Sequence, residues 1–264
     1  MNDQDTKDTP MGNFTVTLHG QSDVGLSRDH NEDDFICESD MNLAILADGM
    51  GGHNAGEVAS QIAVQQVCNA LKAVLRPEFE LSSDIQYKDI VRDAVELANT
   101  EIHEHSLEHP ECAGMGTTLV SSLVRDDNII LANVGDSRIY RLRDEALEQL
   151  TNDHSLVQEL VDNGYLSAEE ASLSVSKNLI TRALGIGAEV EVDVFVHDIQ
   201  DGDLYLLCSD GLSDLVEDEF IESTLKESPD DLVATAKALI SCANTNGGTD
   251  NITVILVSIT VASE

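Results

Sequence analysis

The sequence has 264 residues, of which 50 are acidic and 14 are basic, and its formal net charge is −36 at pH 7. Such a negative surface repels phosphate backbones and anionic lipids, which argues against nucleic-acid binding and against membrane-surface binding. A hydrophobic content of 42% is enough for a sizeable core. Aromatic residues make up only 3% and Trp is absent, so Ala, Val, Ile and Leu must build that core.

The cysteines and the first residues indicate a reduced, cytoplasmic protein. The five cysteines form no CxxC pair, and none begins the Cys-x5-Arg loop of a cysteine phosphatase. The segment 1–11 is polar, has no signal-peptide pattern and is expected to be a disordered tail. No uncharged apolar stretch approaches the roughly 20 residues that a membrane span needs. Without a heptad pattern or an exposed apolar stripe, we expect a monomer.

Hydrophobic periodicity predicts the elements of an α+β fold in one domain, residues 12–264. Strands are predicted at 14–20, 43–48, 117–124, 128–134, 137–143, 189–199, 203–209 and 251–259. Helices are predicted at 55–75, 84–105, 155–163, 216–227 and 231–243. Residues 164–187 have weak periodicity and are rich in Ser and Ala, which suits a mobile surface segment. Helix pairs interrupt the strands without the β-α alternation of a doubly wound sheet.

Acidic residues recur at the ends of the predicted strands. Asp48, Asp136 and Asp210 each follow an apolar run, and Asp250 precedes the last one. If neighbouring strands are antiparallel, the end of one and the start of the next share an edge of the sheet. A single Asp-Gly is more often an ordinary turn, but its repetition at strand ends indicates that several carboxylates converge.

Converging carboxylates need cations or protons. Two of them about 4 Å apart repel by roughly 4 kcal/mol at an effective dielectric constant near 20. No Cys or paired His accompanies the acids, so hard oxygen ligands should favour Mg²⁺ or Mn²⁺ over zinc or copper. Gly49, Gly51 and Gly52 would let the backbone approach the ions, and a main-chain carbonyl could serve as a ligand.

An arginine lies beside further acids in the segment VGLSRDHNEDDF, residues 24–35. Arg28 precedes Glu32 by four residues and Asp33 by five. Next to a metal cluster, a guanidinium suits bidentate capture of a phosphate group. These groups together predict in-line attack on phosphorus by a metal-bound hydroxide, with no covalent protein nucleophile.

Eight segments resemble, in order, the motifs of the bacterial metal-dependent (PPM, type 2C) serine/threonine protein phosphatases. They are RDHNED, ADGMGGHNAGEVAS, MGTTLV, ANVGDSRIYRLR, LTNDHSLVQELVDNG, NLITRALG, LLCSDGLSD and GGTDNITVILV. The ordered set covers nearly the whole chain beyond the first dozen residues. The resemblance implies a four-layer α-β-β-α sandwich of two antiparallel sheets flanked by helix pairs, with the metals at one end. Residues 164–187 correspond to the family's variable flap.

The resemblance also implies roles for individual residues in a binuclear centre. Asp48 would bridge two Mn²⁺ or Mg²⁺ ions, and the carbonyl of Gly49 would bind one of them. Asp210 and Asp250 would complete the other. Arg28 would bind the phosphate group.

Four more acids match secondary positions of the family pattern. Glu32 and Asp33 match positions that hold metal-bound waters or ligate directly. Asp136 and Asp214 match a weaker third-metal site of bacterial members.

The residue that protonates the leaving group is open. Animal relatives carry a histidine directly after the Asp-Gly, where this sequence has Met50. His53 is the nearest histidine, and either His53 or a metal-bound water could be the acid. A structural role for His53 is an equal alternative.

The implied function is hydrolysis of phosphoserine and phosphothreonine on proteins, counteracting a bacterial Ser/Thr kinase. One alternative is a catalytically dead scaffold that binds phosphoproteins, which is disfavoured because Asp48, Asp210, Asp250 and Arg28 are all retained. The other is a phosphatase of small phosphate esters or nucleotides. The negative surface should disfavour free polyanions relative to a phosphosite in a basic peptide.

Overall fold

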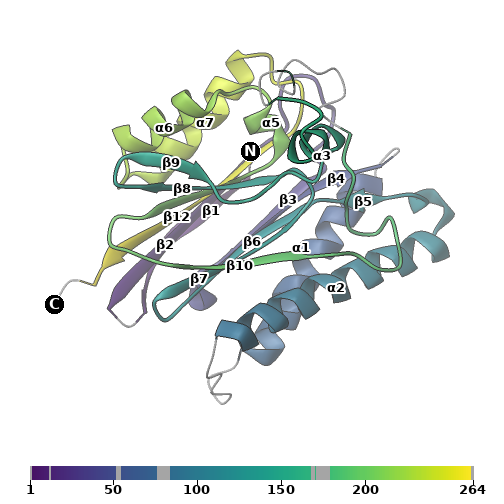
Figure 1. Cartoon of the computed structure of the whole chain (residues 1–264), viewed down its shortest axis with the longest axis horizontal. Helices are drawn as coiled ribbons and strands as arrows, with labels where there is room; N and C mark the ends of the chain where they lie inside the picture. Colours follow the sequence, from purple (N-terminus) through teal and green to yellow (C-terminus); the bar gives the residue numbers. More distant parts are fainter. Residues whose placement is uncertain are drawn as a thin grey trace.

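The computed structural model describes residues 2–11, 13–51, 55–75, 84–167, 170 and 179–262. Its strands form two antiparallel sheets packed face to face (Figure 1). The first sheet has the order β1 (Asn2–Met11), β2 (Phe14–Asp23), β12 (Ile252–Val261), β11 (Leu204–Cys208), β8 (Arg138–Arg143), β9 (Ala146–Gln149). The second has the order β10 (Asp193–Asp198), β7 (Asn128–Val134), β6 (Leu119–Arg125), β4 (Leu43–Met50), β3 (Asp33–Glu38), and β5 (Gly116–Thr117) pairs with β4.

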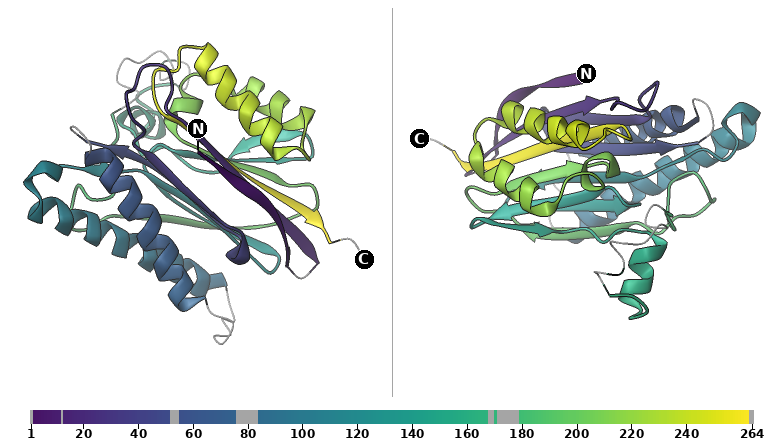
Figure 2. Two further views of the ribbon diagram at one scale, coloured as in Figure 1. Left: turned by 180° about the vertical axis from the view of Figure 1, so that it is seen from behind. Right: turned by 90° about the horizontal axis from the view of Figure 1, so that it is seen from above.

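A pair of helices covers the outer face of each sheet. The helices α1 (Ala55–Val74) and α2 (Asp84–Glu108) pack on the second sheet, and α6 (Asp218–Glu227) and α7 (Leu232–Thr245) pack on the first. The two pairs lie on opposite sides of the molecule when it is seen from behind (Figure 2). The predicted four-layer α-β-β-α sandwich is therefore confirmed. No helix in the ranges given above is long and apolar enough to cross a membrane.

Strand β4 shows why the central strands read as continuous apolar runs. Leu43, Ile45 and Ala47 pack in the core beneath α1 and α2. Ala44 and Leu46, which point to the other face, pack in the core between the two sheets. Because successive side chains of a strand alternate in direction and both faces are covered here, every position must be apolar.

Strand direction brings distant acids to one end of the sandwich. Asp33 at the start of β3 is the cross-strand partner of Asp48 in β4. Asp136 follows β7, which runs in the same direction as β4 because both are antiparallel to β6. In the other sheet, β11 ends next to the start of its antiparallel partner β12. Asp210 and Asp250 flank those two strand ends, as the sequence predicts.

The predicted disordered tail at 1–11 is wrong for the described residues 2–11. Asn2–Met11 forms strand β1, which pairs with the edge of β2 from Asn2↔Ser22 to Met11↔Phe14. Composition failed here because pairing uses backbone groups that every residue carries, and an edge strand needs few apolar side chains. The register also shifts between Gln4 and Lys7, which interrupts any simple alternation.

Other differences are small. The sequence missed β3, β5, β9 and a short helix α5 (Asp210–Ser213), all of which are brief or rich in polar residues. The strand predicted at 189–199 is confined to β10, and α3 (Leu156–Asp162) lies within its predicted range. Of the predicted flap, residues 168–169 and 171–178 lie outside the described residues.

The core between the sheets should dominate stability. Leu46 is fully buried there, so Leu46→Ala should lower the free energy of unfolding by about 2–5 kcal/mol in urea titrations. Leu97→Ala is the control, because Leu97 on α2 is 51% exposed and its loss should cost about 0.5 kcal/mol or less. Equal losses in the two variants would contradict the packing described here.

Candidate metal centre

Five aspartates, which we call the carboxylate cluster, meet at one end of the sandwich. Its members are Asp33, Asp48, Asp136, Asp210 and Asp250. Burial is the largest cause that raises the pKa of Asp48, and the charges of the other four aspartates raise it further. Burial and neighbouring charges also raise the pKa of Asp210 well above its ordinary value. Buried like charges are costly, so the cluster must be matched by protons or cations.

Backbone contacts hold Asp48 in place at the end of β4. Its N–H donates to Thr118 Oγ1 at 3.1 Å, and its carbonyl accepts from the Thr118 N–H at 2.9 Å and from Thr117 Oγ1 at 2.8 Å. Gly49 then donates its N–H to the Glu32 carbonyl at 3.1 Å. A Cβ on Gly49 would collide with the Gly56 carbonyl at the start of α1, so only glycine allows this close approach.

Two buried hydroxyls bind one oxygen of Asp33. Ser209 Oγ donates to Oδ2 at 2.9 Å and Thr253 Oγ1 donates to the same atom at 2.6 Å. Burial raises the pKa of Asp33 to about 6, although these hydrogen bonds favour the ionised form, and the charge of Asp250 raises it further.

Arg28 lies at the solvent-exposed edge of the carboxylate cluster, next to Glu32 and Asp250. Its Nη2 donates to Asp250 Oδ2 at 2.7 Å, and its Nη1 lies 3.7 Å from Glu32 Oε2. The Arg28 side chain is 46% exposed, so the guanidinium can reach a ligand from solvent. Asn251 fixes this corner, because its Oδ1 accepts from the Glu32 N–H at 2.8 Å and its Nδ2 donates to the carbonyls of Val24 and His30.

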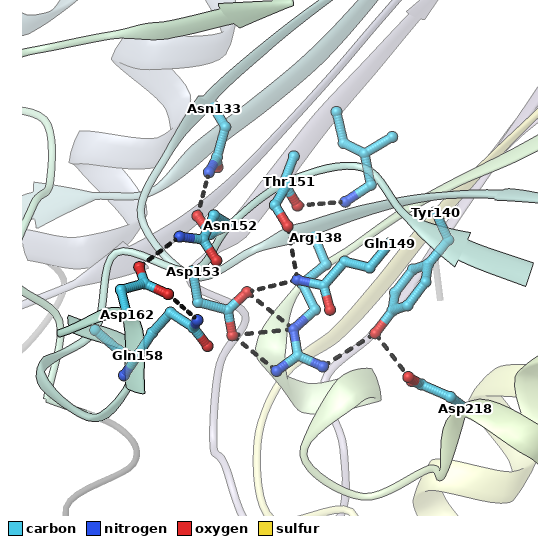
Figure 3. A network of polar contacts seen from close by, with 12 residues as sticks. Asn133, Arg138, Tyr140, Gln149, Thr151, Asn152, Asp153, Gln158, Asp162 and Asp218 are labelled. Atoms are coloured by element: carbon cyan, nitrogen blue, oxygen red, sulfur yellow. Dashed lines mark hydrogen bonds and ion pairs between the residues drawn. The ribbon is translucent and has the colours of Figure 1, made fainter. Parts of the chain in front are cut away.

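A separate ionic network lies close to Asp136 in the chain, around Arg138 and Asp153 (Figure 3). Arg138, two residues along the chain, makes a bidentate contact with Asp153, with Nη2 to Oδ2 at 2.7 Å and Nε to Oδ1 at 3.0 Å. It also donates to the Tyr140 hydroxyl, which donates to Asp218. Burial is the main cause that raises the pKa of Asp136 to about 6, and the negative charge of Asp153 is the second.

The turn before Asp136 is held by a histidine. Gly135 has a φ of +108°, and its N–H donates to His154 Nδ1 at 3.0 Å. Because Nδ1 accepts this bond, the imidazole is neutral with its hydrogen on Nε2, which lies 3.1 Å from Asp193 Oδ2. A Cβ on Gly135 would press against Thr118, whose hydroxyl supports Asp48. The supports of Asp48 and Asp136 are therefore in contact.

The donor set fits hard divalent cations. Four buried carboxylate oxygens have no hydrogen-bond partner among the described residues: Glu32 Oε1, Asp33 Oδ1, Asp136 Oδ1 and Asp210 Oδ1. Buried polar atoms are normally paired, so unpaired anionic oxygens gathered at one place indicate ion ligands. No three His, Cys, Asp or Glu side chains in the described part of the chain already surround one point as ligands of a single ion. Asp250 shows most clearly why no such group has formed, because its two oxygens accept hydrogen bonds from Arg28 and from the Asn251 N–H.

The structure thus brings together most of the residues that the sequence singles out. Asp214, in the turn after α5, lies close enough for its charge to raise the pKa of Asp136 and Asp210. His53 lies outside the described residues. No role was assigned from the sequence to several residues that bind the acids or their neighbours: Ser22, Asn31, Ser209, Asn251 and Thr253. Several stand next to a candidate ligand in the chain, which is the one signal that could have found them.

Comparison with known proteins agrees with this geometry. Residues 26–256 match the family model described as protein phosphatase 2C. The serine/threonine phosphatase stp of Listeria monocytogenes is 42% identical over 243 residues, covering 90% of this chain and 93% of that protein. The crystal structure of the Mycobacterium tuberculosis serine/threonine phosphatase PstP/Ppp has a TM-score of 0.82 at 40% identity, covering 92% of this chain and 98% of that one. A structure of the PstP catalytic domain in complex with two manganese ions has a TM-score of 0.80 at 40% identity, covering 94% and 99%.

Fold, site and sequence together define a phosphoric monoester hydrolase with an acidic metal centre. The chain belongs to the protein phosphatase 2C family. It is a serine/threonine protein phosphatase of the bacterial PPM type.

The raised pKa of Asp33 predicts a pH-dependent effect on stability. The unfolded chain releases this proton near the ordinary pKa of 3.8, whereas the folded protein holds it until about 6. In that window the folded state binds more protons, so this group makes the protein less stable as pH rises. In EDTA, Asp33→Asn should therefore become progressively more stable than the wild type between pH 4 and pH 7.

Urea titrations at several pH values measure this difference directly. Asp230→Asn is the control, because Asp230 is exposed in a turn and its curve should stay parallel to that of the wild type. A parallel curve for Asp33→Asn as well would show that Asp33 is not the desolvated group described here.

Proposed function

We propose that this chain hydrolyses phosphoserine and phosphothreonine on proteins with two core Mn²⁺ or Mg²⁺ ions held by the carboxylate cluster. The observation that supports this most strongly is the burial of Asp48 among four other aspartates, together with the unpaired carboxylate oxygens around it. The manganese ions in the PstP catalytic domain, at 40% identity, point the same way.

The residues present suggest how two ions would be shared. Asp48, at the centre of the cluster, would bridge them, with the carbonyl of Gly49 on one ion and Asp210 and Asp250 on the other. Glu32 and Asp33 would bind directly or through water. Asp136 and Asp214 would hold a third ion, on the side of the cluster where both charges raise the pKa of Asp210.

Bound cations of this kind neutralise the carboxylates and lower the pKa of water enough for it to attack phosphorus at neutral pH. Arg28 supplies the complementary group, because a guanidinium binds two oxygens of a phosphate at once. In this structure Arg28 is paired with Asp250. With Asp250 holding a cation, Arg28 would be available to bind the phosphate group and align it.

We further propose a proton donor for the leaving group and a flap beside the site. His53 or a water would protonate the leaving serine or threonine oxygen. Residues 164–187 would form a flap beside the site, in a single domain that includes strand β1 as well as the predicted residues 12–264. The C-terminal part of this segment is anchored by two isolated β-bridges, one between Ile180 and Ser155 and one between Leu184 and Thr117.

The partners follow from the chemistry. We propose a cytoplasmic monomer that reverses the action of a bacterial Ser/Thr kinase on shared phosphoprotein substrates. With a net charge of −36, the surface should favour phosphosites flanked by basic residues over free polyanions.

Removing a core ligand should abolish catalysis. Asp210→Ala should lower kcat/KM for a phosphothreonine peptide in manganese by about 100-fold or more, since even outer-sphere changes cost about 10–100-fold. Asp230→Ala is the control on an exposed aspartate and should behave as wild type. EDTA should silence the wild type, and manganese should restore it. Undiminished turnover by a folded Asp210→Ala variant would contradict the proposal.

Arg28 should act mainly in substrate binding. Arg28→Ala should raise KM for phosphopeptide by about 10–100-fold, the value of a charged hydrogen bond of about 1.5–3 kcal/mol, with a smaller change in kcat. Arg28→Lys should recover part of the loss, and Arg92→Ala, at an exposed ion pair on α2, should change neither constant. A large fall in kcat with KM unchanged would assign Arg28 a different role.

A further inference from the structure

A closed ring of hydrogen bonds runs through Asp33 and joins the two sheets. The Asp33 N–H donates to Asn31 Oδ1 at 3.2 Å, and Asn31 Nδ2 donates to Ser22 Oγ at 2.7 Å. Ser22 Oγ lies 2.7 Å from Thr253 Oγ1, which donates to Asp33 Oδ2 at 2.6 Å. Ser22 and Thr253 are cross-strand partners in β2 and β12 of the first sheet, whereas Asp33 begins β3 of the second.

The direction of every bond in this ring is fixed. Thr253 has a single hydroxyl hydrogen, and the ionised Asp33 carboxylate can only accept, so that hydrogen points to Asp33. Ser22 must then donate to Thr253, and its own oxygen accepts from the Asn31 amide. Asn31 is oriented in turn because its oxygen faces the Asp33 N–H. Bonds aligned in one direction polarise and strengthen one another.

Burial makes the ring a rigid support. Thr253 and Ser209 are fully buried, and Ser22 is nearly so. Ser209 adds a second donor to Asp33 Oδ2 and accepts from the Thr253 N–H at 3.0 Å. Water therefore cannot substitute for these donors, and the carboxyl group has one orientation.

The two oxygens of Asp33 are consequently unlike. Oδ2 carries both hydroxyl donors, whereas Oδ1 is buried and has no partner among the described residues. We infer that Thr253, Ser22 and Ser209 are positioning residues that hold Asp33 Oδ2 and so present Oδ1 to the metal centre. This inference rests on the proposed function, and it assigns the hydroxyls a role in cation affinity and not only in folding.

Thr253→Val is the decisive variant because it removes the donor and keeps the branched shape. Manganese alone is titrated calorimetrically into the full chain after EDTA treatment and dialysis. Thr253→Val should bind manganese about 10–100-fold more weakly, the usual effect of removing a group that orients a ligand. Thr253→Ser, which keeps the hydroxyl, should bind as the wild type does.

The control is another buried threonine. Thr235 on α7 is 1% exposed and donates to the Ser228 carbonyl at 2.9 Å, away from the carboxylate cluster. Thr235→Val should lower stability and leave manganese affinity unchanged. Ser22→Ala removes a hydroxyl that binds Thr253 and not Asp33 itself, so it should weaken manganese binding less than Thr253→Val does. If Thr253→Val fails to fold, the manganese affinity of Ser22→Ala tests the inference instead.

The outcomes separate the inference from the function on which it rests. Wild-type affinity in folded Thr253→Val or, where that variant does not fold, in Ser22→Ala would overturn the inference while leaving the phosphatase assignment intact. An equal loss in Thr235→Val would also overturn it, because the effect would then be one of general stability. A wild type that binds no manganese would overturn the metal centre itself and the inference with it.

Discussion

The crowding of buried carboxylates at one end of the sandwich is the constraint on which the rest of this structure depends. Two such charges about 4 Å apart oppose folding by roughly 4 kcal/mol at an effective dielectric constant near 20, and this protein gathers five. Packing elsewhere must hold them together against that repulsion. A fold that tolerates the repulsion when empty gains correspondingly when cations neutralise it.

The sandwich meets this requirement with strand ends and hydroxyl groups. Strands buried on both faces fix where each aspartate leaves the sheet, and antiparallel pairing brings starts and ends to the same edge. Thr118 holds the backbone of Asp48, and the ring through Thr253 holds the carboxyl group of Asp33. Arg138, two residues after Asp136, is held in a bidentate pair by Asp153, and its charge offsets only part of the rise in the pKa of Asp136.

The sequence predicted the layers and the acids better than their supports. Apolar runs ending in aspartate reveal Asp48 and Asp210, because a strand buried on both faces has a distinctive composition. The edge strand β1 was missed, since backbone pairing leaves no such signature. The bonds from Thr253 and Ser209 to Asp33 span 220 and 176 residues, and no local pattern reports a contact of that separation. A hydroxyl in a strand looks the same whether it orients a ligand or only packs.

Crystals grown with manganese chloride, with anomalous scattering recorded at the manganese edge, would test the central claim most directly. We expect two strong peaks on either side of Asp48, one of them within ligand distance of Asp210. Such a structure should also show Asp250 turned away from Arg28. Manganese bound only elsewhere, or absent from a site where the five aspartates remain unchanged, would contradict the account.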